Sequence, residues 1–256
     1  MLRKNWTYEE TIIAFDLYAK IPWEKINSRN PVIVEVAKKL GRTSAALSMK
    51  LDNLARLDSA VISKGFSSLT HGAKLEEQIW YEFYQDRDLF LEKVNSIVKN
   101  YGITKFESNI EEHDLIIPQG ATKEVVTKIR IGQNFFRNAV LSAYNFKCCI
   151  TGICVTDLLV ASHIKPWAKS SAQEKTDPHN GLCFNTLHDK VFDKGYMTLK
   201  DDYTIIVSDK LKRYPNIDEV TKKFIVSCEG HKIFVPNKFM PTKEFLEYHR
   251  DVIFKR

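Results

Sequence analysis

Apolar residues recur at helical spacing through the first part of the chain and predict a series of short helices. Thr7 and Glu10 have the spacing of a capping box, so the stretch YEETIIAFDLYAK is expected to form a helix that begins near residue 7. Asn30 is a preferred N-cap and Pro31 suits the first helical position, so a second helix is expected to start there and to end at Gly41. Its apolar positions are Ile33, Val36, Ala37 and Leu40.

A third helix is expected behind Thr43, the residue that follows a tight turn. Leu47, Leu51 and Leu54 make one narrow apolar stripe on this helix. The outline is that of a helix-turn-helix-like unit whose third helix enters a DNA major groove. The alternative is a small helical bundle that only packs on the rest of the protein or on another subunit. Lying away from the stripe are Ser48, Asn53 and Arg56. In a DNA complex, phosphate contacts are expected from Arg42 and Lys50, and base contacts from Ser48 and Asn53.

Two stretches without clear periodicity divide the chain. Residues 58–72 are rich in serine and glycine and are expected to form a connector, and residues 102–120 end in the breaker sequence Pro118-Gln119-Gly120. Between them, a spacer helix or helix pair is expected, with buried positions at Trp80, Tyr84, Phe90 and Val94. The predicted domains are therefore a helix-turn-helix-like unit over residues 1–62, a helical spacer and linker over 73–120, and a third domain over 121–256.

From about residue 121 the sequence becomes basic. A stretch that is helical through QNFFRNAVLSAY carries Lys123, Lys128, Arg130 and Arg137, and such a helix can flank bound DNA. The alternative is a solvated face, with Phe135, Val140 and Leu141 turned inward. After residue 201 the segments TIIVS, KFIVS and HKIFV precede a terminal helix from about Thr242, which indicates an α+β fold.

The centre of this third domain, residues 148–195, concentrates polar residues of chemical interest. Leu158 to Ala161 is an apolar run suited to a strand that delivers Ser162 and His163 to its end, and Pro166 stops it. A polar loop over 169–178 follows. The return strand starts at Asn180-Gly181, and Asn185 or Thr186 is placed to cap a helix that carries His188.

The order strand, loop, strand and helix is that of a ββα-metal finger. Phosphodiester hydrolysis in such a finger needs an activated water and a cation that neutralises charge growing on the phosphate. We expect His163 to be the general base, since the pKa of an imidazole lies near neutrality. His188 is expected to bind the metal, Mg²⁺ or another hard divalent ion, although an imidazole ligand leaves Mn²⁺, Ni²⁺ and Zn²⁺ open. Asn180 is expected to hold the loop backbone and keep the His163 strand in register.

These residues resemble the HNH endonucleases, and more closely the HNH restriction endonucleases. The resemblance rests on CCITG, ASHIKPW and NGLCFNTLHDKVFDKG, and it extends to GQNFFRNAVLSAY, to PTKEFLEYHRDVIF and to the N-terminal WTYEETIIAFDLYAKIPW and KKLGRTSAALSMKL. It implies a restriction or anti-phage enzyme that cleaves double-stranded DNA with a single metal ion and leaves 5′-phosphate and 3′-hydroxyl ends. On the family's pattern His163 is the base, Asn180 the central asparagine and His188 a metal ligand.

The position before His163 departs from the family's pattern. Many HNH nucleases carry Asp or His there as a second metal ligand, and this chain has Ser162. The ion is then expected to be held by His188 with waters and the DNA phosphate, or by a further carboxylate such as Asp193. Asp189 and Asp193 can instead pair with neighbouring lysines. Lys165 is expected either to contact phosphate or to be solvated, and His179 is expected to be a loop residue.

Composition narrows the remaining choices. A net charge of +6 suits a polyanionic partner but is also common in proteins that bind none. Five cysteines, with Cys148 and Cys149 adjacent and without paired C-x-x-C knuckles, argue for a reducing cytoplasm and against structural zinc. The start MLRKNWTYEE does not read as a secretory signal, and no segment approaches a membrane span.

The alternatives to a restriction enzyme are a homing or mobile-element nuclease with the same finger, and a DNA-binding regulator in which the finger is only a fold. Two-strand cutting by a single-centre nuclease often uses two copies, so a homodimer is the prior expectation.

Overall fold

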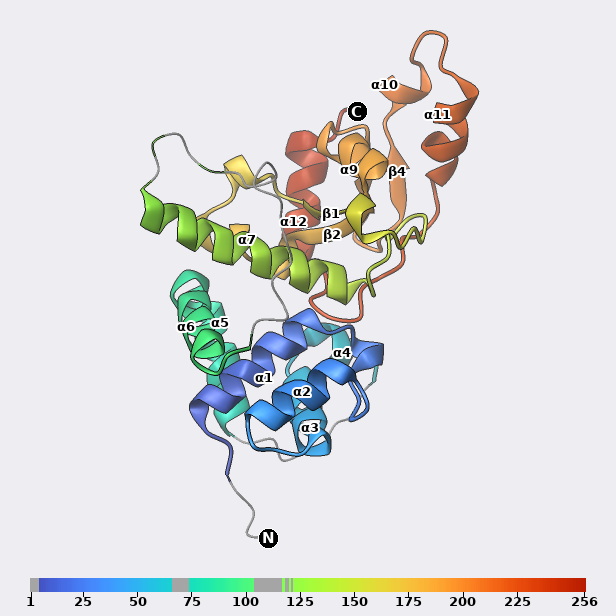
Figure 1. Ribbon diagram of the computed structural model, residues 1–256. Coiled ribbons are helices and arrows are strands. Elements are labelled where there is room, and N and C mark those ends of the chain that lie inside the picture. Colours follow the sequence, from blue (N-terminus) through green and yellow to red (C-terminus); the bar gives the residue numbers. More distant parts are fainter. Residues whose placement is uncertain (1–4, 66–73, 104–116, 118–119, 121) are drawn as a thin grey trace.

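The computed structural model describes residues 5–65, 74–103, 117, 120 and 122–256, and has an α+β architecture (Figure 1). Helices dominate, and two small antiparallel sheets lie in the C-terminal half. The N-terminal helices are α1 Tyr8–Lys20, α2 Pro31–Lys39, α3 Ser44–Ala55, α4 Ser59–Ser63, α5 Lys74–Gln85 and α6 Arg87–Asn100. The remaining elements are α7 Lys123–Ala143, β1 Leu159–His163, α8 Ala172–Lys175, β2 Gly181–Asn185, α9 Thr186–Asp193, β3 Met197–Leu199, β4 Ile205–Val207, α10 Asp209–Lys212, α11 Glu219–Phe224 and α12 Lys243–Tyr248.

The first three helices begin at the predicted caps. The Thr7 hydroxyl accepts from the Glu10 amide at 3.2 Å, and the Glu10 carboxylate accepts from the Thr7 amide at 2.9 Å, which completes the capping box. The Asn30 side chain accepts from the backbone at the start of α2, and Thr43 does the same for α3. Gly41, with φ of +62°, takes the left-handed conformation that ends α2. Local sequence is therefore sufficient to set these helix starts.

Helices α1 to α6, called the helical domain below, share one hydrophobic cluster. Phe15 of α1 lies at its centre, with ring centroids 5.2 Å from Trp80, 5.0 Å from Phe83 and 5.3 Å from Phe90. The helix pair α5 and α6 thus completes the core of the N-terminal helices, so the described parts of the predicted 1–62 and 73–120 units pack as one body. The predicted burial of Trp80, Phe90 and Val94 is confirmed, but Tyr84 is 45% exposed, so that expectation was wrong.

The face of α3 that was expected to be free is partly covered by α5. Lys50 is only 2% exposed, and its ammonium lies 2.6 Å from the carboxylate of Glu76, which is equally buried. Ser48 is also buried. On the same side, the Trp80 indole donates to the Leu54 carbonyl at 3.0 Å. The expectation that Ser48 and Lys50 lie on an open face is therefore corrected, because a helix from another part of the sequence packs there.

Helix α7 lies between the helical domain and the C-terminal half (Figure 1). Phe135 and Ala139 pack into the cluster of the helical domain, whereas Phe136, Val140 and Leu141 pack into a second cluster formed by the C-terminal half. The predicted burial of Phe135, Val140 and Leu141 is confirmed. One helix therefore holds both cores, which fixes the C-terminal half against the helical domain.

The C-terminal half follows the predicted order around its centre. β1 pairs with β2, α9 follows β2, and the short hairpin of β3 and β4 comes next. The segment TIIVS contains β4, whereas KFIVS ends α11 and enters a 3-10 turn, and HKIFV contributes only a bridge between Thr204 and Lys232. The terminal helix begins after Thr242 as predicted.

Some predicted connectors lie outside the described residues. These are residues 66–72 of the first connector and, in the second, most of 104–119, including Pro118 and Gln119. Within the described residues, no helix is both long and apolar enough to cross a membrane.

Candidate active site

The hairpin of β1 and β2 positions the two residues at the end of the first strand. In its antiparallel register Ser162 is paired with Leu182, and His163 with Gly181. Since successive side chains of a strand point to opposite faces, Ser162 and His163 project to different sides of the hairpin. One side is covered by α7 and the other by α9, so the two residues have separate environments.

His163 projects toward α7. Its imidazole lies flat on the ring of Phe136, with centroids 3.9 Å apart and planes 8° apart, and Trp167 meets it edge-on at 5.5 Å. Its Nε2 lies 2.9 Å from the carbonyl oxygen of Lys175. Because a carbonyl only accepts, Nε2 carries the proton and donates, and the lone pair is on Nδ1. Burial lowers the pKa of His163 to about 4, so the ring is neutral at pH 7 and able to take up a proton.

Asn180 holds the finger loop, which we define as residues 164–180. The side chain is fully buried; its oxygen accepts from the Lys165 amide at 2.8 Å, and its nitrogen donates to the carbonyls of Lys165 and Glu174 at 3.2 Å each. The Ile164 amide donates to the Asn180 carbonyl at 2.9 Å. These contacts tie both ends of the loop to its middle, which is the backbone-holding arrangement expected of Asn180.

Ser162 projects toward α9 and meets Asp189, a residue expected from the sequence to pair with a neighbouring lysine. Its hydroxyl lies near the carboxyl group of Asp189, which is half-buried. Burial raises the pKa of Asp189, while the polar interaction with the Ser162 side chain opposes that rise. Asp189 lies in the first turn of α9, where the sequence alone predicts only a favourable interaction with the helix dipole. Only the approach of α9 to β1 places Asp189 beside Ser162.

His188 is buried against the end of α11 and the turn that follows it. Its Nδ1 lies 3.1 Å from the Asn185 side-chain oxygen, and its Nε2 lies 3.0 Å from the Phe224 carbonyl oxygen, with the Cys228 sulfur at 3.9 Å. Burial lowers its pKa. Among the described residues, no hydrogen bond or ring contact joins His188 to His163. The two histidines thus have different partners, and a metal bound to Nε2 of His188 would take the place of the Phe224 carbonyl.

Asp193, the third predicted metal ligand, lies one helical turn beyond Asp189. Its side chain is exposed and lies 3.9 Å from Lys190. Within the parts of the chain that the structure describes, no cluster of three or more His, Cys, Asp or Glu side chains is arranged to hold a metal. A hard cation such as Mg²⁺ commonly uses only one or two carboxylates and keeps several waters. The half-buried carboxyl of Asp189 and the hydroxyl of Ser162 fit that mode of binding.

The basic residues expected to contact DNA have different surroundings. Arg137 donates to the Leu159 carbonyl at 2.9 Å, and Lys165 lies 2.7 Å from the Glu174 carboxylate. Arg130 is exposed on α7. In the helical domain, Arg42 is bound to Glu10 at 2.6 Å and Asn53 is half-buried. Arg42, Lys50 and Arg137 therefore hold the fold through their own contacts.

His179, expected to be a loop residue, lies in a short turn before β2 and is buried. Its Nδ1 lies 2.8 Å from the carboxylate of Asp177, and its ring meets Phe239 edge-on at 5.7 Å. His179 therefore contributes to packing between this turn and Phe239, and holds the Asp177 carboxylate.

Comparison with known proteins agrees with this geometry. Residues 148–200 match the family model described as HNH endonuclease, a span that includes β1, the finger loop, β2, α9 and β3. No curated protein matches the chain. The resemblance to HNH endonucleases predicted from the sequence is confirmed over these residues, and it implies nuclease chemistry and a nucleic-acid substrate.

Proposed function

We propose that this protein is a metal-dependent DNA endonuclease in which His163 is the general base. The observation that carries the proposal is the hydrogen bond from His163 Nε2 to the Lys175 carbonyl. It fixes the tautomer and leaves the Nδ1 lone pair to accept a proton from an attacking water. Stacking on Phe136 fixes the plane of the ring, so the direction of that lone pair is set before substrate binds.

Ser162 and Asp189 are the residues proposed to hold the divalent ion, with His188 and Asp193 as the further ligands expected from the sequence. Mg²⁺ suits the oxygen donors of Ser162 and Asp189, and Mn²⁺ or Ni²⁺ suits a set that includes His188. When bound, the ion supplies positive charge to the phosphate and to the leaving oxygen. The raised pKa of Asp189 supports this placement, since a bound cation would offset the cost of burying the charged carboxylate.

The distribution of charge supports a DNA interface on the C-terminal half. Residues 121–256 contain 22 Lys and Arg against 15 Asp and Glu, whereas residues 1–120 contain 16 against 17. The net positive charge of the chain thus lies in the half that contains the finger, where basic residues can bind the phosphates of the DNA that is to be cut. Arg130, Arg137 and Lys165 are the phosphate contacts proposed in this half, and Arg42 and Asn53 are the DNA contacts proposed in the helical domain.

The biological role proposed is that of a restriction or anti-phage enzyme acting on double-stranded DNA in the cytoplasm. Support for it comes from the sequence resemblance to HNH restriction endonucleases over most of the chain. The same resemblance supports 5′-phosphate and 3′-hydroxyl ends. Because each chain has one catalytic centre, a homodimer would allow the two copies to cut one strand each.

The test is plasmid cleavage by the purified full chain with Mg²⁺ or Mn²⁺, using methylated and unmethylated DNA. His163→Ala is expected to lower the rate at least about 100-fold, the usual contribution of a general base. His231→Ala, which removes an exposed histidine, is the matched control and is expected to cut like the parent. Equal cutting by parent and His163→Ala would remove His163 as the base. DNA binding without cutting under every metal would instead support the regulator.

A further inference from the structure

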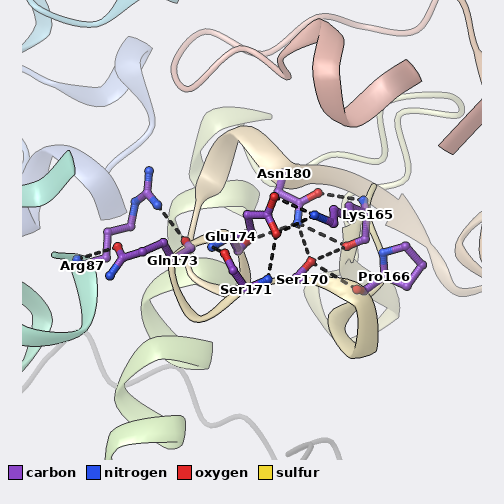
Figure 2. A network of polar contacts seen from close by, with 8 residues as sticks. All are labelled: Arg87, Lys165, Pro166, Ser170, Ser171, Gln173, Glu174 and Asn180. Carbon is purple, nitrogen blue, oxygen red and sulfur yellow. Dashed lines mark hydrogen bonds and ion pairs between the residues drawn. The ribbon is translucent and has the colours of Figure 1, made fainter. Parts of the chain in front are cut away.

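Helix α6 of the helical domain begins directly on the finger loop. The Arg87 amide donates to the side-chain oxygen of Gln173 at 2.8 Å, and the Arg87 guanidinium donates to the Gln173 carbonyl at 2.7 Å (Figure 2). A second guanidinium nitrogen lies 2.7 Å from the Asp177 carboxylate. Arg87 therefore grips the loop at two positions through three hydrogen bonds.

The grip is buried and ionic. Arg87 is 5% exposed, and its guanidinium lies 5.0 Å from the ring centroid of Phe83. Burial works against ionisation of Asp177, but the hydrogen bond from His179 and the charge of Arg87 hold the pKa of Asp177 below its usual value. The pair is therefore ionised at neutral pH. Removing one member leaves the other charged and buried, which is far more disruptive than the loss of a surface pair.

The two gripped positions flank the residue that orients the proposed base. Lys175 lies two residues after Gln173 and two residues before Asp177, and its carbonyl accepts the hydrogen bond from His163. The adjacent residue, Glu174, makes two further contacts. Its carbonyl accepts a hydrogen bond from the Asn180 side chain, and its carboxylate accepts one from the Lys165 ammonium (Figure 2). A network thus runs from Arg87 through the short helix α8 to both His163 and Asn180.

We infer that Arg87 is a positioning residue that holds the Lys175 carbonyl in place and thereby fixes the tautomer and orientation of His163. The helical domain is then a structural part of the catalytic centre, in addition to any contact it makes with DNA. This inference rests on the proposed role of His163 as the base. It assigns to the start of α6 a function that neither a DNA-reading unit nor a simple spacer would have.

Arg87→Ala tests the inference in the full chain, with Arg56→Ala as the matched control. Arg56 also joins two elements of the helical domain through a carboxylate, Glu77 at 3.1 Å, but this contact does not involve the finger loop. Arg87→Ala is expected to lower the single-turnover cleavage rate at saturating DNA by about 10- to 100-fold, as a displaced base does, while DNA affinity changes less than about twofold. Arg56→Ala is expected to cleave at the parent's rate.

A second measurement needs neither metal nor DNA. Nitrogen-15 NMR of the histidine side chains at pH 7, with the His163 signals assigned from His163→Ala, reports which ring nitrogen carries the proton. The parent is expected to show the Nε2–H tautomer at His163. Arg87→Ala is expected to show a mixture of tautomers, and Arg56→Ala the parent spectrum.

Arg87→Lys keeps the charge beside Asp177 but cannot make the forked contacts, so an intermediate rate and a partly restored tautomer are expected. This variant carries the test if Arg87→Ala does not fold. A folded Arg87 variant with the parent's rate and the parent's tautomer overturns the inference. If the parent protein binds DNA but cuts it under no condition, the proposed function is contradicted instead. The spectra then still show whether Arg87 sets the His163 tautomer.

Discussion

The imidazole of His163 and the ring of Phe136 are stacked, with centroids 3.9 Å apart and planes 8° apart. Phe136 comes from α7, the helix that also enters the core of the helical domain through Phe135 and Ala139. The proposed base therefore packs against α7, the helix that joins the two halves of the protein. Its low pKa follows from this packing, since burial disfavours the charged imidazolium.

The first prediction concerns Phe136→Leu, which keeps an apolar side chain but uncovers part of the His163 ring. Because burial holds the His163 pKa at about 4, added water should raise that pKa toward the ordinary value of 6.5. The acid limb of the pH–rate profile for DNA cleavage should then move upward by on the order of one unit. At pH 8, where the ring is neutral in both proteins, a lower rate in the variant would reflect the lost orientation of the ring and not its pKa; an unshifted acid limb would contradict the assignment of His163.

A second prediction separates the two acidic residues of α9. Asp189→Asn should raise the Mg²⁺ concentration needed for half-maximal cleavage by about tenfold or more, because it removes the charge beside Ser162. Asp193→Asn should change that concentration much less, since its side chain is exposed and lies 3.9 Å from Lys190. Metal titrations of the two variants followed by calorimetry provide a readout that does not depend on cleavage. The reverse ranking would return the ligand role to Asp193.

Substitution of the fully buried Asn180 should damage stability and activity together. Asn180→Ala leaves the Lys165 amide without a partner, at a cost of about 1–3 kcal/mol, and removes one of the hydrogen bonds that the carbonyls of Lys165 and Glu174 accept. Asn180→Asp still accepts from the Lys165 amide but cannot donate to either carbonyl, so it should rescue only in part. Urea unfolding of both variants measures the loss. Parent-like stability in Asn180→Ala would show that the loop is held elsewhere.

The pH dependence of stability should carry a contribution from His249. This ring is stacked on Phe192 at 3.7 Å, and burial lowers its pKa from 6.5 to about 4. Between these values the unfolded chain binds a proton that the folded chain does not, so the free energy of unfolding falls as pH falls from 6.5 to 4. The loss attributable to this group is on the order of 3 kcal/mol.

His249→Gln removes this titration and is the variant with which to measure it. Urea unfolding at pH 7.5, 5.5 and 4.5 should show a smaller decline in the variant than in the parent, whatever its stability at pH 7.5. Parallel declines in the two proteins would show that His249 does not titrate in this range.

The sequence by itself determined the local features of the fold. The capping residues Thr7, Asn30 and Thr43 start their helices through hydrogen bonds within three residues, so no distant part of the chain is needed. The strand, loop, strand and helix around His163 could also be predicted, since apolar runs and breakers mark each element. The order of these elements predicted a ββα-metal finger, the quoted motifs resembled HNH endonucleases, and the match of residues 148–200 confirms that resemblance.

Tertiary structure alone decided which polar residues are buried and which side chains meet. Lys50 sits on a helix whose own pattern leaves it at the surface, yet α5 covers it and supplies Glu76 as a partner. The meeting of Ser162 with Asp189, and of Arg87 with the finger loop, depends on packing between segments far apart in sequence. Sequence periodicity records the face that a helix buries against its nearest partner, and it carries no record of a second element that packs on the other side.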